Sequence, residues 1–97
     1  MRARIVTGIA QPGKLDELIN TYQNSVVPAA RQQRGLRGAY LLTNINTGKG
    51  VSITLWETEA DMLAGESSGY LREQMAKIAS YLAAAPVVEH FEISVEA

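Results

Sequence analysis

The stretch VSITLWETEAD, residues Val51–Asp61, begins with a β-strand pattern and ends with the start of an α-helix. From Val51 to Trp56, aliphatic residues alternate with Ser, Thr and Trp, the period-2 pattern of a strand with two different faces. Thr58 is a good N-cap, and Asp61, three residues later, resembles the acidic partner of a capping box. The stretch therefore predicts a strand leading directly into a helix, with Trp56, the only tryptophan, at the junction.

Similar patterns elsewhere predict the other elements of the fold. The expected strands cover residues 2–10, 36–44, 51–56 and 87–95, and in the second of them Leu36, Gly38, Tyr40 and Leu42 share a face. An amphipathic stripe predicts a helix from Leu15, with a kink at Pro28 or a stop there and a short restart through residue 33. A second helical region runs from Thr58 to residue 84, interrupted at Gly65–Gly69, which we expect to be the most mobile part of a pocket rim.

The resulting order, βαββαβ, predicts a single domain over residues 1–97 of the ferredoxin-like α+β class. In this arrangement an antiparallel sheet carries its helices on one face. Right-handed crossovers put the first and third strands in the centre and pair the last strand with the first. The face of the first strand with Arg2 and Arg4 is then expected to meet the face of the last strand with Glu92 and Glu96.

Composition excludes several classes of function. Nine basic and ten acidic residues give a net charge of −1, which offers no general attraction to nucleic acid or an anionic membrane. Cysteine is absent, so disulfides and thiolate metal sites are excluded, and the lone His90 makes a poor metal site. No apolar run is long enough for a membrane helix, and the N-terminus lacks a signal peptide, so we expect a cytoplasmic protein.

The strands carry apolar residues on both faces, although helices are expected to cover only one of them. A monomer would expose the other face as an apolar patch, which monomeric proteins rarely do. The sequence therefore predicts a homodimer in which two copies pack through their open sheet faces.

The run Trp56–Asp61, together with Gly35–Gly38 before the second strand, resembles the antibiotic biosynthesis monooxygenase family. That family consists of dimeric α+β barrels with a Trp-Glu-Ser/Thr-Glu turn after the third strand. It includes oxygenases of aromatic polyketides that use no cofactor, haem-degrading enzymes and quinol oxygenases. The resemblance thus implies a dimeric α+β barrel and no bound cofactor.

The resemblance also implies site residues. The polyketide oxygenases use a tryptophan, which Trp56 matches, a strand asparagine, whose place is taken by Ser52, and a tyrosine, whose place is taken by Met62. The residues that the haem-degrading branch needs are replaced by Val6, Gly65 and Met75. The sequence therefore argues against haem degradation.

Each candidate residue has a functional and a structural interpretation. Trp56 can stack on a planar ligand or fill the core where strand meets helix. Ser52 and Thr54 share its face and can border a pocket, while Tyr22 and Tyr40 can place hydroxyl groups in that pocket or simply pack. His90 can act as a general base, or be a solvated or carboxylate-paired histidine.

Two hypotheses follow for the function. The first is a monooxygenase without a bound cofactor that acts on a small phenol or quinol held between helices and sheet. The second is a non-catalytic module of the same fold that binds a small aromatic molecule, or only assembles as a dimer.

Overall fold

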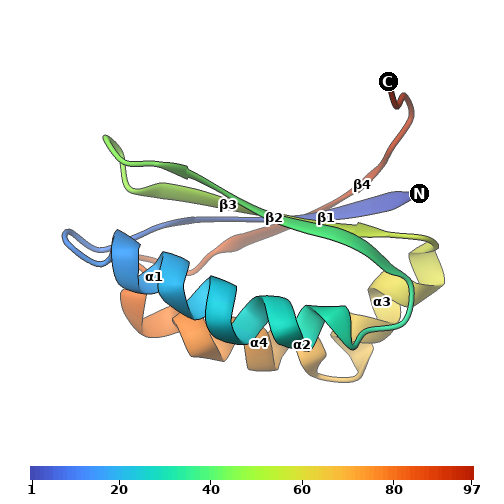
Figure 1. Ribbon diagram of the computed structural model, residues 1–97, viewed down its shortest axis with the longest axis horizontal. Coiled ribbons are helices and arrows are strands. Elements are labelled where there is room, and N and C mark those ends of the chain that lie inside the picture. The colour runs from blue at the N-terminus through green and yellow to red at the C-terminus, as the bar shows by residue number, and fades with distance from the viewer.

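The computed structural model describes all 97 residues and shows a four-stranded antiparallel sheet with its helices on one face (Figure 1). The elements in chain order are β1 (Arg2–Ile9), α1 (Leu15–Thr21), the π-helical turn η1 (Tyr22–Val26), α2 (Val27–Arg31), β2 (Leu36–Asn44), β3 (Lys49–Trp56), α3 (Glu59–Ser67), α4 (Tyr70–Ile78), the 3₁₀ turn η2 (Ala79–Tyr81) and β4 (Val87–Glu92). This is the predicted ferredoxin-like α+β fold. No helix has both the length and the hydrophobicity needed to cross a membrane.

The strands lie in the order β2-β3-β1-β4, and every neighbouring pair is antiparallel. This confirms the prediction that β1 and β3 are central and that β4 pairs with β1. The junction after β3 is also confirmed, because the Thr58 hydroxyl accepts a hydrogen bond from the Asp61 backbone N–H at 3.1 Å. The Glu57 N–H donates to the Gly35 carbonyl at 2.8 Å. This hydrogen bond ties the turn before β2 to the junction between β3 and α3.

A β-bulge near the start of β2 corrects one predicted face. Leu36 pairs with Trp56 while Gly38 pairs with Leu55, which leaves Arg37 as an extra residue without a partner. Since cross-strand partners point to the same side of a sheet, Leu36 lies with Trp56 on the helix-covered side. The prediction that Leu36 shares a face with Gly38 is therefore wrong.

Of the two alternatives predicted at Pro28, a kink or a stop with a restart, the structure contradicts the stop, because the helix continues through Pro28. Residues 15–31 are helical throughout, and the turn just before Pro28 is π-helical, with the Val27 N–H donating to the Tyr22 carbonyl. Proline lacks the N–H that would continue the α-helical ladder. The π-helical turn lies directly before this incomplete part of the ladder, and the helix ends at Arg31, four residues before the left-handed Gly35.

The second helical region breaks where α3 meets α4, but the break is shorter than predicted. It lies at Ser68 and at Gly69, which has a φ of +89°, whereas Gly65 belongs to α3. A Cβ at Gly65 would lie 3.4 Å from the Tyr70 side chain of α4, an ordinary van der Waals contact, so the close packing here does not require a glycine. Two further boundaries also fall earlier than predicted, since α4 gives way to η2 after Ile78 and β4 ends at Glu92.

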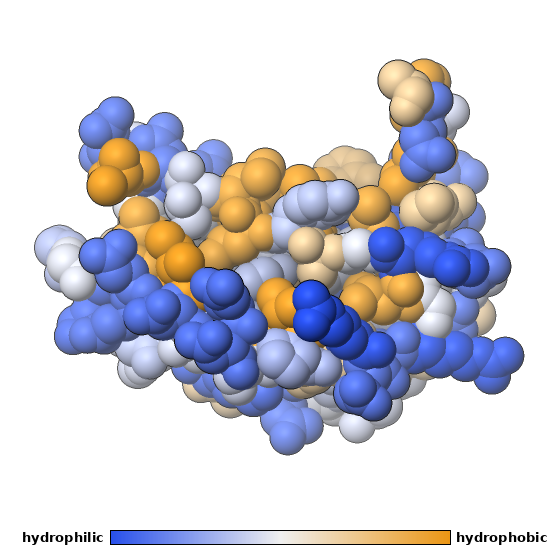
Figure 2. Space-filling model, viewed as in Figure 1, coloured by the Kyte–Doolittle hydropathy of each residue, from blue (hydrophilic) through white to orange (hydrophobic).

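The sheet face away from the helices exposes apolar side chains of β1, β2 and β4, with partly exposed ones on β3 between them. Figure 2 shows them as an orange band, hollowed between the β2–β3 hairpin and the C-terminal tail. The exposed members include Ile9, Tyr40, Leu42, Val87 and Phe91. Nothing within the chain covers this surface, which we call the open face.

Gly35 and Gly13 give a matched test of the turn that holds the junction. Both have a positive φ, but a Cβ at Gly35 would lie 2.7 Å from the Asp61 Cβ, whereas at Gly13 nothing lies within 4 Å. We expect Gly13→Ala to lower the free energy of unfolding by about 1–2 kcal/mol, the usual penalty of a left-handed conformation. Gly35→Ala should cost more, because Asp61 must also move. Urea denaturation measures both, and equal losses would contradict the role of this contact.

Candidate functional site

A cavity of about 60 Å³ lies between the sheet and the helices. β1 and β3 form its floor, and the first helix and α4 form its walls. Most of the lining is apolar, with Leu18, Val26, Leu71 and Ile78 among the walls. The polar residues that line it are Arg4, Tyr22, Ser52, Thr54, Tyr70 and Gln74. A mostly apolar space with a few placed polar groups is typical of small-molecule sites.

A pair of hydroxyl groups forms one polar corner of the cavity. The Tyr22 and Ser52 oxygens are 2.8 Å apart, and the Tyr22 hydroxyl also donates to the Tyr40 carbonyl at 3.4 Å. Burial raises the pKa of Tyr22, while the Ser52 hydrogen bond and the Arg4 charge act in the opposite direction. Tyr22 is therefore neutral at physiological pH and serves as a hydrogen-bond donor.

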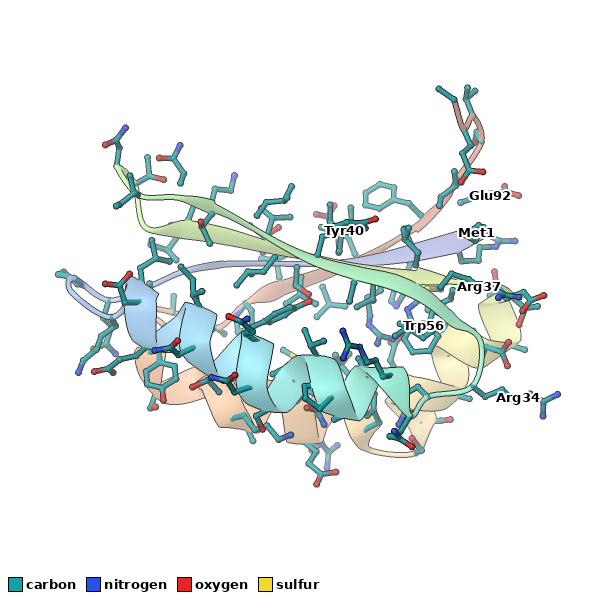
Figure 3. The ribbon with its side chains drawn as sticks, in the orientation of Figure 1. Met1, Arg34, Arg37, Tyr40, Trp56 and Glu92 are labelled. Atoms are coloured by element: carbon teal, nitrogen blue, oxygen red, sulfur yellow. The ribbon has the colours of Figure 1, made fainter.

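Trp56 lies behind the cavity rather than along it (Figure 3). Its side chain is 0 % exposed, and its indole N–H donates to the Thr54 hydroxyl at 2.9 Å. The Arg4 guanidinium carbon lies 5.1 Å from the centre of the ring, which is a cation–π distance. Thr54 and Arg4 line the cavity and Trp56 does not, so this geometry favours the structural interpretation of the tryptophan.

Arg4 is the functional candidate that sequence reasoning missed. It is 2 % exposed, and its Nη1 donates to the Met62 carbonyl at 3.1 Å and to the Glu66 carboxylate at 3.2 Å. Arg2, two residues earlier, pairs with Glu59 at 3.3 Å. The predicted meeting of this face of β1 with the Glu92 face of β4 is confirmed for Arg2, but neither arginine forms its ion pair there. Arg2 does lie opposite Glu92 in the register, but the partner carboxylates come from α3.

The structure separates the remaining sequence candidates from the cavity. Met62 is buried beside Arg4 but does not line the open space. The Tyr40 side chain is 56 % exposed and lies on the open face (Figure 3). His90, on the edge strand β4, hydrogen-bonds the Glu66 carboxylate at 2.7 Å, which is the carboxylate-paired alternative. Of the predicted residues, the cavity thus brings together Tyr22, Ser52 and Thr54.

Gln74 and Tyr70 on α4 also line the cavity and were not predicted. Gln74 is 7 % exposed, and its side-chain oxygen accepts a hydrogen bond from the Lys77 ammonium at 2.9 Å. The signal for it was present in the sequence. Gln74 lies three residues after Leu71 and four before Ile78, so it interrupts an otherwise apolar helical stripe.

Solved structures with the same fold support the assignment of the architecture. The chain superposes on a Bordetella bronchiseptica protein with a TM-score of 0.82, 21% identity and 97% coverage of both chains. For a Nitrosomonas europaea protein the TM-score is 0.79 at 14% identity, with 98% of this chain and 100% of that chain covered. Both carry the name antibiotic biosynthesis monooxygenase. A third, a protein of unknown function from Nitrosomonas europaea, is 24% identical with a TM-score of 0.77, covering 99% of this chain and 91% of that one.

At these identities, the likeness to solved structures shows the fold alone. No curated protein matches the chain. The family model described as antibiotic biosynthesis monooxygenase matches residues 1–77, which include the cavity floor, Trp56 and most of α4. On this match, the chain belongs to the antibiotic biosynthesis monooxygenase family.

Proposed function

We propose that the cavity binds a small phenol or quinol and that the protein adds oxygen to it as a monooxygenase without a bound cofactor. The observation that carries this proposal is the Tyr22–Ser52 hydroxyl pair at one corner of an otherwise mostly apolar cavity. An aromatic ring suits the apolar walls, and its hydroxyl group suits the paired oxygens.

The hydroxyl pair would orient the ligand rather than take its proton. Because the pKa of Tyr22 is raised by burial, its phenol is a poor base at neutral pH. Its single proton would turn from the Tyr40 carbonyl to the ligand oxygen, while the Ser52 hydroxyl donates to the Tyr22 oxygen. The ligand hydroxyl then loses its proton to solvent, and the protein contributes binding, orientation and the removal of water around the ring.

The reaction that fits such a site is a direct one between the ionised ring and molecular oxygen. A ring carbon that bears a hydrogen gives one electron to O₂, and the two radicals combine to form a carbon–peroxide bond. Protonation of the peroxide and loss of water then leave a carbonyl at that carbon. One oxygen atom enters the product and the other leaves as water, with both hydrogens of that water drawn from the substrate.

The size of the cavity favours a substrate with a single ring. A cavity of 150 Å³ binds benzene in another protein, whereas this one measures about 60 Å³. Even one ring therefore requires the walls to move apart. The left-handed Gly69 between α3 and α4 lies where such a movement would be easiest, because α4 carries Tyr70, Leu71 and Gln74 on the cavity wall.

The second candidate function is a non-catalytic module that binds the same class of molecule. The complete burial of Trp56 favours it, because a covered indole does not touch a ligand. Ser52 and Met62 also stand where the resemblance implies an asparagine and a tyrosine. In this alternative the cavity fills and empties without consuming oxygen.

We further propose that two copies pair through the open face. The support is the set of exposed apolar side chains there, which no part of the chain covers. In a sheet-to-sheet dimer these side chains would leave water, and the open face would become a shared core.

Tyr22→Phe tests the enzyme directly. Removing the hydroxyl leaves Ser52 without its partner, so oxygen consumption with anthrones and hydroquinones should fall by roughly tenfold or more, in line with a lost hydrogen bond to a reacting group. Tyr81→Phe is the matched control, because Tyr81 bonds Thr21 outside the cavity and its loss should leave the rate unchanged. Ligand binding without any oxygen uptake by the unmodified protein would select the non-catalytic alternative.

Leu42→Lys tests the dimer. Light scattering of the unmodified protein should give twice the 10.5 kDa mass of one chain, and a charge at Leu42 on the open face should shift the protein toward the monomer. Leu63→Lys, an equally drastic change at an exposed residue of α3, should leave the mass unchanged. A monomer mass for the unmodified protein at micromolar concentration would refute the dimer.

Trp56→Ala separates a core residue from a ligand-stacking one. Because the indole is fully buried, its removal should lower the free energy of unfolding by roughly 3–5 kcal/mol. Trp56→Phe keeps most of the apolar volume and should cost less, while leaving ligand affinity nearly unchanged. Calorimetric melting and ligand titration measure the two effects. A stable Trp56→Ala protein that no longer binds the ligand would show instead that the tryptophan contacts the ligand.

A further inference from the structure

We propose that Arg4 binds a negatively charged oxygen of the ligand, so that the molecule taken up is a small aromatic anion, an ionised phenol or an aromatic carboxylate. This inference rests on the proposed function, because it takes the cavity to be the ligand site. It adds the residue that would hold the negative charge of the ligand, which the proposed function leaves unassigned.

Arg4 is the one charged residue that lines the cavity. No aspartate, glutamate or lysine shares the lining with it, and most of the remaining surface is apolar. A single cation in such a space interacts more strongly with a charged ligand than it would in water, because the surroundings have a low dielectric constant. The cavity therefore favours an anionic over a neutral or cationic guest.

The guanidinium also has donors to spare. The recorded hydrogen bonds of Arg4, to the Met62 carbonyl and the Glu66 carboxylate, all come from Nη1. The Nε and Nη2 groups donate to no other group of the chain. Arg4 is one of the residues that line the cavity, so a ligand there would lie next to its side chain. Two neighbouring N–H groups on a planar fork match the two oxygens of a carboxylate or the single oxygen of a phenolate.

Glu66 does not fully neutralise this cation. Its Oε2 atom lies 3.2 Å from Arg4 and 2.7 Å from the His90 Nε2, so one oxygen serves two partners. Its side chain is also partly exposed, which weakens its field at Arg4. Burial raises the pKa of Tyr22 and of Tyr70, and the nearby Arg4 charge opposes that rise at both.

The neighbouring pair Arg2–Glu59 supplies a natural control. It joins the same strand to the same helix at 3.3 Å, but both side chains are substantially exposed and neither lines the cavity. Any effect of total protein charge should therefore appear equally in variants of either pair. An effect of a local anion site should appear only in variants of Arg4 and Glu66.

The experiment compares two ligands of nearly the same shape, 4-nitrophenol and 4-nitroanisole, of which only the first can ionise. Titration calorimetry at a pH where 4-nitrophenol is mostly ionised should show it binding at least roughly tenfold more tightly than the anisole, equivalent to one unit of pKa. The absorbance of the bound ligand should give a pKa below that of the free molecule, because an adjacent cation stabilises the phenolate. Equal affinities, with no change of the ligand pKa, overturn the anion site and leave the aromatic cavity of the proposed function intact. Failure of both ligands to bind overturns the proposed function and this inference together.

Variants then assign the effect to Arg4. Glu66→Gln removes the competing negative charge and should raise the affinity for 4-nitrophenolate several-fold, with little change for 4-nitroanisole. Arg4→Gln should abolish the preference between the two ligands. Arg2→Gln and Glu59→Gln should change neither affinity. If Arg4→Gln does not fold, as judged by circular dichroism, Glu66→Gln decides alone: a weaker or unchanged affinity for the phenolate overturns the proposal.

Discussion

The burial of the Arg4 guanidinium constrains the arrangement of every element around the site. Removing an arginine from water costs several kcal/mol unless charged and polar partners surround it. Here the partners are the Met62 carbonyl and the Glu66 carboxylate, both on α3, with the Trp56 ring against the guanidinium. These contacts therefore fix both the position of α3 along β1 and β3 and its rotation about its own axis.

Most of the architecture could be predicted from local patterns, because those patterns act within a few residues. The alternation in β1 and β3, the Thr58 cap and the breaker residues fix strands, helix starts and turns without reference to distant chain segments. The bulge at Arg37 and the π-helical turn before Pro28 were beyond such rules, since each inserts one residue into a ladder whose phase is set by tertiary packing. The lengths of β4 and α4 were also overestimated, because their ends depend on what they pack against.

The site was harder to predict than the fold for a related reason. Ser52 and Thr54 were predicted because a strand's alternation states which side chains share a face, and Tyr22 because it lies on a helical stripe. Arg4 lies on a strand with the same alternation, but the residues that accept its hydrogen bonds are 58 and 62 residues away in the sequence. Charge alone does not reveal whether an arginine is solvated or buried. Trp56 shows the converse, since a residue that matches a family motif lies behind the cavity, covered by Thr54 and Arg4.

The π-helical turn has a consequence for the geometry of the first helix. Leu18, Tyr22, Val26 and Ala30 all line the cavity at intervals of four residues. In a regular α-helix four residues overshoot one full turn by about 40°, so three such steps would carry the last side chain about 120° around the axis. The wider turn at Tyr22–Val26 winds less per residue and cancels part of this drift. One helix can thereby keep all four of these side chains on the cavity wall, with Tyr22 among them.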